Sequence, residues 1–247
     1  MSEEIIHELL GYKHIQIVQR PDMFNFSLDS ILLADFVSVK NSVKKIVDLG
    51  CGNAPIPLFL TLKTKALIYG IEIQKDVYDL ALKSVKLNKL EDQITIINAD
   101  LKNIYKTINA NSFEIVISNP PYFKYLPGSN INKNDYLTIA RHEVLASLED
   151  IIIETKKLLV DKGQFFLIHR TERLSEIIVL LNKYKFSIKK IRFVYPKVED
   201  EEALLVLIES RLNASEGMKV VKPLYVYEGE NIYTKEVEKI FNFPKQK

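Results

Sequence analysis

The sequence predicts an α/β fold built on a mostly parallel β-sheet with helices on both faces. Short apolar runs rich in Ile and Val alternate with longer segments of helical periodicity, and this alternation is typical of parallel sheets. The runs are continuously apolar, as expected for strands buried on both faces. Because 47% of the residues are hydrophobic, the chain can build a sizeable core.

The expected strands and helices follow in order along the chain. Seven strands are expected at 44–50, 66–73, 93–100, 113–118, 164–170, near 186–195 and at 203–210. Helical patterns occupy 76–89 and 143–159, and 223–241 is expected to form a short strand, a turn and a terminal helix that serve packing. Residues 1–42 are expected to form an N-terminal extension of the domain that spans 43–247.

Composition excludes several classes of protein. No apolar run approaches the length of about 20 residues that crosses a bilayer. The acidic N-terminus does not resemble a signal peptide, so we expect a cytoplasmic protein with no membrane partner. Cys51 is the single cysteine and the four histidines are scattered, so no metal site is expected.

Polar groups follow four successive strands of the predicted sheet. Asp48, Gly50 and Gly52 end the first strand, Glu72 ends the second, Asp100 the third, and the sequence Asn119-Pro-Pro-Tyr the fourth. Ligands of open α/β sheets bind at the carboxyl ends of the strands, so these groups are expected to line one site. Glu72 lies 24 positions after Asp48, a spacing that suits a carboxylate that binds ribose hydroxyls.

The glycine loop also permits another interpretation. A glycine loop followed by an acidic residue is found in nicotinamide-dependent oxidoreductases. The third glycine of that fingerprint is missing, because Ala54-Pro55 occupies its region. Pro55 and Pro57 are further expected to interrupt the helix start that would hold a pyrophosphate.

The four motifs in this order resemble the class I S-adenosylmethionine-dependent methyltransferases that modify exocyclic or amide nitrogens. The resemblance covers roughly residues 40–210, and it implies a Rossmann-like seven-stranded sheet whose last strand is antiparallel. It also implies that the glycine loop and Asp48 surround the methionine part of S-adenosylmethionine. Glu72 would then bind the ribose hydroxyls, and Asp100 would face the adenine amino group.

The Asn119-Pro-Pro-Tyr sequence suits methyl transfer to a conjugated nitrogen. The Asn119 side-chain carbonyl and the Pro120 backbone carbonyl can accept the hydrogens of the nitrogen, and Pro121 has no N–H to compete for them. Tyr122 can stack on a planar substrate. We therefore expect Asn119, Pro120 and Tyr122 to be catalytic, with Asn119 also contacting the cofactor, and Pro121 and Tyr122 to contact substrate.

Three substrates share this motif: adenine in nucleic acid, guanine in ribosomal RNA and the glutamine amide of release factors. Residues 8–36 resemble the N-terminal signature of bacterial tRNA adenine-N6 methyltransferases that act beside the anticodon of a valine tRNA. This resemblance implies tRNA as partner, and it places Phe26 and Asp29 beside the glycine loop, where they would close over the cofactor. The glutamine and guanine alternatives stay open.

Charged segments near the motif give weaker indications of a nucleic-acid partner. Lys124 and Arg141 flank the motif and either contact substrate phosphates or remain solvated. The basic window 177–198, interleaved with aromatic residues, is either a nucleic-acid surface or partly core. The acidic residues 199–202 would repel a phosphate placed against them.

Overall fold

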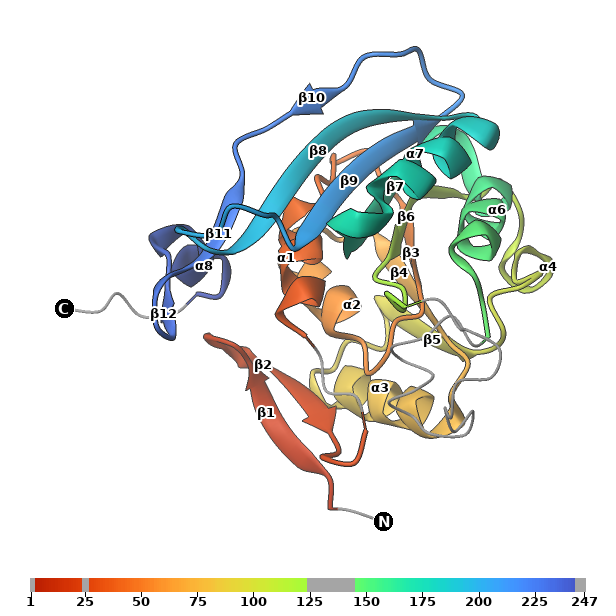
Figure 1. Cartoon of the computed structure of the whole chain (residues 1–247). Coiled ribbons are helices and arrows are strands. Elements are labelled where there is room, and N and C mark those ends of the chain that lie inside the picture. The colour runs from red at the N-terminus through yellow and green to blue at the C-terminus, as the bar shows by residue number, and fades with distance from the viewer. Residues whose placement is uncertain (1–2, 24–26, 124–144, 243–247) are drawn as a thin grey trace, which may run out of the picture.

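The computed structural model describes residues 3–23, 27–123 and 145–242. Figure 1 shows a large twisted sheet with helices packed on it and a separate two-stranded hairpin. The strands are β1 (Ile5–Leu9), β2 (Tyr12–Gln19), β3 (Lys45–Leu49), β4 (Leu67–Glu72), β5 (Ile94–Asn98), β6 (Phe113–Ser118), β7 (Leu159–Arg170), β8 (Phe186–Lys197), β9 (Leu205–Leu212), β10 (Lys219–Val220), β11 (Leu224–Gly229) and β12 (Ile232–Tyr233). The helices are α1 (Leu28–Phe36), α2 (Pro55–Leu60), α3 (Lys75–Leu87), α4 (Tyr105–Ile108), α6 (Leu148–Leu158), α7 (Leu174–Lys183) and α8 (Lys235–Ile240), with a 3-10 turn η1 (Thr171–Arg173).

The main sheet confirms the predicted topology and extends it. Its strand order is β12-β11-β8-β9-β7-β6-β3-β4-β5, with β10 also paired to β8. Strands β3 to β7 run parallel to one another, and β9 is antiparallel to both of its neighbours, β7 and β8. All seven expected strands are present. The sheet is larger than expected because β10, β11 and β12 add to its β8 side, so the C-terminal segment joins the sheet as well as packing on it.

Two hydrophobic cores lie on the two faces of the sheet. Successive side chains of a strand point to opposite faces, and β3 shows this clearly. Ile46 joins the cluster that includes residues of α1, α2, α3 and α8, while Val47 joins the cluster with residues of α4, α6 and α7. The helices therefore cover both faces, as predicted.

The α6 boundary differs from the sequence expectation. The helix was expected to start at 143 but begins at Leu148, because Ser147 caps it. The Ser147 hydroxyl accepts from the Asp150 N–H and the Asp150 carboxylate accepts from the Ser147 N–H, a capping box that fixes the first turn. Leu145 and Ala146 precede the helix, and 143–144 lie outside the described residues.

The N-terminal hairpin of β1 and β2 packs on α3. The Val18 N–H donates to the Ser84 hydroxyl at 3.0 Å, and the Gln16 backbone exchanges two hydrogen bonds with the Asn88 amide. The Asn53 amide donates to the Val18 carbonyl at 3.0 Å. The hairpin is thus bonded to both α3 and the loop that follows β3.

The turn of this hairpin also contacts the C-terminal segment. The Gly11 N–H donates to the Phe241 carbonyl at 2.9 Å, and the Tyr12 hydroxyl donates to the Ile240 carbonyl at 3.0 Å. A Cβ on Gly11 would meet the Asn242 backbone oxygen at 2.1 Å. Glycine is therefore needed at position 11 for the close approach of the two backbones.

Candidate active site

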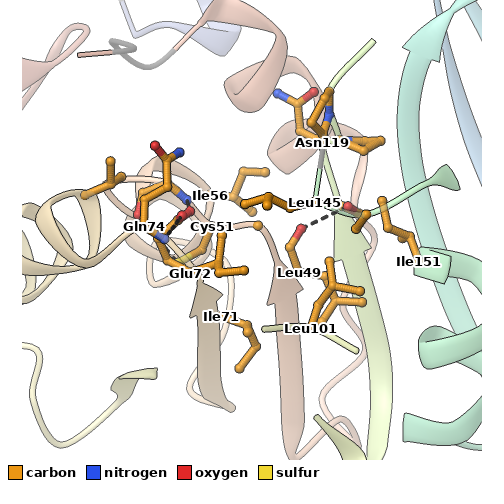
Figure 2. A pocket seen from close by; sticks show the side chains of 18 of the residues that line it. Leu49, Cys51, Ile56, Ile71, Glu72, Gln74, Leu101, Asn119, Leu145 and Ile151 are labelled. Carbon is orange, nitrogen blue, oxygen red and sulfur yellow. Dashed lines mark hydrogen bonds between the residues drawn. The ribbon is translucent and has the colours of Figure 1, made fainter. Parts of the chain in front are cut away.

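A cavity lies at the carboxyl ends of β3, β4, β5 and β6, as the strand-end rule predicts (Figure 2). Its wall includes seven of the predicted site residues: Gly50, Gly52, Glu72, Asp100, Asn119, Pro120 and Pro121. In Figure 2, Glu72 and Gln74 lie on one side of the cavity and Asn119 lies across from them. Four motifs that are distant in sequence thus form one site.

Three of the other predicted site residues are described and lie outside the cavity wall. Asp29, Asp48 and Tyr122 are not part of the cavity wall. Phe26, Lys124 and Arg141 lie outside the described residues, so the predictions made for them remain predictions.

The glycine loop turns through the left-handed region. Gly50 has φ +77° and Gly52 has φ +57°, and a Cβ on either would meet nothing within 4 Å. Backbone conformation, and not crowding, therefore favours glycine at both positions. The Gly50 and Cys51 N–H groups both donate to the Ile71 carbonyl, which anchors the loop to the end of β4.

The region of the missing third glycine adopts a left-handed turn without glycine. Ala54 has φ +72° and immediately precedes α2. The expectation that Pro55 and Pro57 interrupt the start of this helix is wrong. Pro55 is its first residue, and the first backbone N–H groups of a helix make no hydrogen bond within it, so proline is tolerated there. The two prolines do remove N–H groups that a phosphate would use.

Glu72 connects the glycine loop to the turn after β4. Its side chain is 6% exposed. One carboxylate oxygen accepts from the Gly52 N–H at 3.0 Å and the other from the Gln74 N–H at 2.8 Å. Burial raises the pKa of Glu72, and these backbone hydrogen bonds oppose that shift. Each oxygen keeps a lone pair for a further donor.

Asp48 is fully buried two residues before Gly50. Neither of its carboxylate oxygens has a hydrogen-bond partner in the described part of the chain. Burial raises the pKa of Asp48 well above its usual value, and the nearby Glu72 raises it further. Cys51 is also buried near these acids, and a Cβ on Gly70 would lie 2.7 Å from its sulfur, so this cysteine fills space against β4.

Asp100 lines the cavity after β5 and is exposed. One of its oxygens accepts from the Lys102 N–H at 2.9 Å. The second oxygen stays available to a ligand, because no other described group bonds to it. The preceding Asn98 amide donates to the Glu72 carbonyl at 2.8 Å and ties the end of β5 to the end of β4.

Asn119 is held by side chains from α1 and from its own loop. Its amide nitrogen donates to the Ser30 hydroxyl at 3.0 Å, and its amide oxygen lies 3.0 Å from the Tyr122 hydroxyl. The Tyr122 hydroxyl also lies 2.8 Å from a carboxylate oxygen of Asp29. Burial raises the pKa of Tyr122 well above its usual value, and the Asp29 charge adds to the rise, so the hydroxyl keeps its hydrogen at neutral pH.

Sequence reasoning missed Ser30 and His169. Ser30 follows Asp29 directly, but nothing local indicates that it bonds to a residue 89 positions away. The fully buried His169 ring lies 5.4 Å from the Tyr122 ring, and its Nδ1 accepts from the Arg170 N–H. Burial, with Arg173, lowers the pKa of His169 to about 4, so its imidazole is neutral near pH 7.

Several basic and aromatic side chains of the window 177–198 make contacts within the chain. Lys190 pairs with Glu209 at 3.4 Å and lies over the Phe36 ring, while Arg192 pairs with Glu236 at 2.6 Å. Phe186, one of the interleaved aromatics, is 1% exposed and belongs to a core. These contacts favour the core interpretation for this part of the window.

The acidic residues 199–202 lie at the same edge of the sheet as the cavity. They follow β8, whose end lies at the carboxyl-end edge because β8 runs parallel to β7. The Thr171 N–H, just after β7, donates to the Leu204 carbonyl at 3.2 Å and fixes the end of the acidic loop there.

No helix within the described ranges is long and apolar enough to cross a membrane. Among the same residues, no group of three or more His, Cys, Asp or Glu side chains could hold a metal ion.

Comparison with known proteins identifies a matching family model and a similar curated protein. The family model "Methyltransferase small domain" matches residues 15–187. A Flavobacterium psychrophilum protein named tRNA1(Val) (adenine(37)-N6)-methyltransferase is 22% identical over 231 residues, which cover 92% of this chain and 95% of the relative.

Solved structures share the fold. A crystal structure of a predicted O-methyltransferase from Agrobacterium tumefaciens has a TM-score of 0.68 and 22% identity, over 87% of this chain and 95% of the other. The M. jannaschii TYW2 structure in complex with AdoMet has a TM-score of 0.56 and 17% identity, over 85% and 86%.

Proposed function

This chain belongs to the methyltransferase small domain family, and from that premise we propose that it transfers a methyl group from S-adenosylmethionine to N6 of an adenine in tRNA. The observation that carries the proposal is that Asn119, Pro120 and Pro121 line the same cavity as the glycine loop and Glu72. The name of the Flavobacterium relative, which matches nearly the whole chain, supports the tRNA adenine assignment. The nicotinamide alternative has no support from the family match.

The residues of the cavity fit the cofactor. Glu72 presents two carboxylate oxygens that already accept backbone N–H groups and can accept ribose hydroxyls as well. The free oxygen of Asp100 can accept from an adenine amino group. Asp48 is a buried acid without a partner near the glycine loop, and a cation bound in the cavity would favour its charged form. When bound, S-adenosylmethionine supplies the electrophilic methyl group.

Asn119 and Pro120 would orient the substrate nitrogen. The lone pair of an exocyclic amine is delocalised into its ring, so the amine is a weak nucleophile. The Asn119 amide oxygen and the Pro120 carbonyl can accept its two hydrogens, which localises the lone pair and directs it toward the methyl group. Fixing this alignment lowers the entropic part of the barrier.

The target adenine would leave its stack to enter the cavity, because N6 of a stacked base cannot reach Asn119. The position beside the anticodon of a valine tRNA rests on the likeness to the named relative. The acidic loop 199–202 would hold RNA phosphates away from the β8 side of the site. We therefore expect the RNA backbone to approach from another side.

The test is methyl transfer from labelled S-adenosylmethionine to total tRNA that lacks the modification, followed by mass spectrometry of the nucleosides. Formation of N6-methyladenosine by the wild-type chain, and not by the Asn119→Ala variant, would support the proposal. The variant controls for a contaminating methyltransferase. Parallel reactions with ribosomal RNA and a release factor test the alternatives, and label in either of these but not in tRNA would overturn the tRNA assignment.

A further inference from the structure

The Tyr122 hydroxyl lies between two acceptors. It is 2.8 Å from an Asp29 carboxylate oxygen and 3.0 Å from the Asn119 amide oxygen. A hydroxyl has one hydrogen, so it can donate to only one of them at a time. Which acceptor receives the hydrogen decides how many lone pairs of the Asn119 oxygen remain free.

This choice matters for the reaction, and the inference rests on the proposed function at this point. The Asn119 oxygen is the group that would accept a hydrogen of the substrate amine. A Tyr122 hydroxyl donating to it would use one of its two lone pairs and weaken it as an acceptor. Hydrogen bonds to a carboxylate are shorter and stronger than those to a neutral amide, so Asp29 competes well for the hydrogen.

Ser30 fixes the other end of the same amide. Its hydroxyl accepts from the Asn119 nitrogen at 3.0 Å, so the amide cannot rotate to exchange its oxygen and nitrogen without losing this bond. Asp29 and Ser30 are adjacent in the first turn of α1. The next three residues of that helix, Ile31 to Leu33, are almost fully buried in the core, which holds the turn in place.

We propose that Asp29 is a positioning residue that takes the Tyr122 hydroxyl hydrogen and so leaves the Asn119 oxygen free for the substrate amine. The first turn of α1 thus controls both ends of the Asn119 amide. This role differs from the sequence expectation that Asp29 binds the cofactor; Ser30 contributes to the cavity wall and Asp29 does not.

The test is a double-mutant cycle on the single-turnover rate of methyl transfer, with cofactor and tRNA saturating. Asp29→Ala should lower the rate about tenfold when Tyr122 is present, because the hydroxyl then has only Asn119 as acceptor. In the Tyr122→Phe background, which keeps the ring but has no hydroxyl, Asp29→Ala should lower the rate less than about twofold. Equal losses in both backgrounds would overturn the proposal.

A matched control lies in the same helix. Asp35 is part of α1, and Asp35→Ala removes a carboxylate that makes no described contact with Tyr122. Its effect should be the same in both backgrounds. If Asp35→Ala also showed a loss only when the Tyr122 hydroxyl is present, the cycle would report general damage to α1 and the proposal would fall.

Two readouts are independent of turnover. The cofactor dissociation constant, measured by calorimetry, should be the same for Asp29→Ala as for the wild type. A clear rise in this constant would indicate that Asp29 binds the cofactor and would contradict the proposal. The Tyr122 ionisation, isolated by subtracting the alkaline absorbance titration of Tyr122→Phe, should shift to lower pH in Asp29→Ala. The shift is expected because the Asp29 charge and hydrogen bond raise the pKa of Tyr122 beyond the effect of burial.

Failure of the proposed function looks different from failure of this inference. A wild-type chain that methylates no tRNA adenine refutes the former, while the tyrosine titration still tests the contact between Asp29 and Tyr122. An unchanged titration would overturn the inference even in an active enzyme.

Discussion

The two halves of the cavity are built by different means. The half formed by the loops after β3, β4 and β5, which we propose binds the cofactor and call the cofactor half, is held by main-chain groups. The Gly50 and Cys51 amides bond to the end of β4, and Glu72 accepts from two further amides. The half around Asn119, which we propose binds the substrate and call the substrate half, is held by side chains of α1, because Ser30 bonds to the Asn119 amide and Asp29 bonds to the Tyr122 hydroxyl. The comparison teaches that the cofactor half depends on backbone conformation, whereas the substrate half depends on which side chains α1 presents.

The substitution with the largest expected effect should lower the transfer rate without changing cofactor binding. Asn119→Ala should lower the methyl-transfer rate on the order of 10²–10³-fold, the range for loss of one preorganised hydrogen-bonding group. The cofactor dissociation constant, measured by calorimetry, should stay close to that of the wild type because no cofactor-half residue bonds to this amide. Asn41→Ala, at the opposite edge of the sheet, is the control. Loss of cofactor binding together with activity would show that the halves are not separate.

Glu72→Gln tests the cofactor half in the converse way. The glutamine keeps one acceptor oxygen and places an NH2 group against either the Gly52 or the Gln74 N–H. Losing a charged hydrogen bond costs about 1.5–3 kcal/mol, so cofactor affinity should fall roughly 10- to 100-fold. Glu91→Gln, in an exposed turn, is the matched control. If the transfer rate at saturating cofactor fell by a larger factor than the cofactor affinity, Glu72 would not belong to the cofactor half alone, and the division of the cavity would be wrong.

Asp48→Asn examines the buried acid beside the cofactor half. Because burial raises the folded-state pKa of Asp48, this acid disfavours folding increasingly as pH rises from its unfolded-state pKa to its folded-state pKa, whereas below the unfolded value both states are protonated and the cost vanishes. In the absence of cofactor the variant should be more stable than the wild type at pH 8, by about 1–3 kcal/mol. Urea unfolding at several pH values should show the difference shrinking toward acid. A variant less stable at pH 8 would contradict the pKa direction.

Ser30→Ala should give the smallest effect, and it tests how much the Ser30 hydroxyl contributes to holding Asn119 in the substrate half. The Asn119 nitrogen loses its acceptor, at a cost of about 0.5–1.5 kcal/mol, so the transfer rate should fall roughly 2- to 10-fold. Ser27→Ala, at the start of the same helix, removes a hydroxyl that makes no capping bond and serves as control. A matching fall in Ser27→Ala would assign the loss to α1 as a whole.

The strands and the glycine loop could be predicted because their signals are local. Strands buried on both faces are continuously apolar, and left-handed turns favour glycine, so Gly50, Gly52 and Glu72 were found from sequence. The short strand β10 could not, since two residues carry no periodicity. The hairpin of β1 and β2 was missed because it pairs as a separate sheet, outside the alternation that indicated the fold.

The network around Asn119 could not be predicted for another reason. Its contacts join residues 89 and 93 positions apart, and they form because the fold brings the first turn of α1 beside the loop that follows β6. Sequence reasoning placed Asp29 beside the glycine loop as a cofactor-binding residue, which stays a prediction, and it did not foresee the contact with Tyr122. The role of the Tyr122 ring as a stacking surface for the substrate remains a prediction.

The contact between the hairpin turn and the C-terminal segment has a consequence for how the enzyme is made. Tyr12 and Ile240 lie 228 positions apart in the chain, so the ribosome must synthesise nearly the whole protein before this bond can form. Helix α8 also packs with α1 in one core. The core that packs on α1 is therefore completed only when Val237, Ile240 and Phe241 have been synthesised, and a nascent chain that lacks them would leave apolar surface exposed.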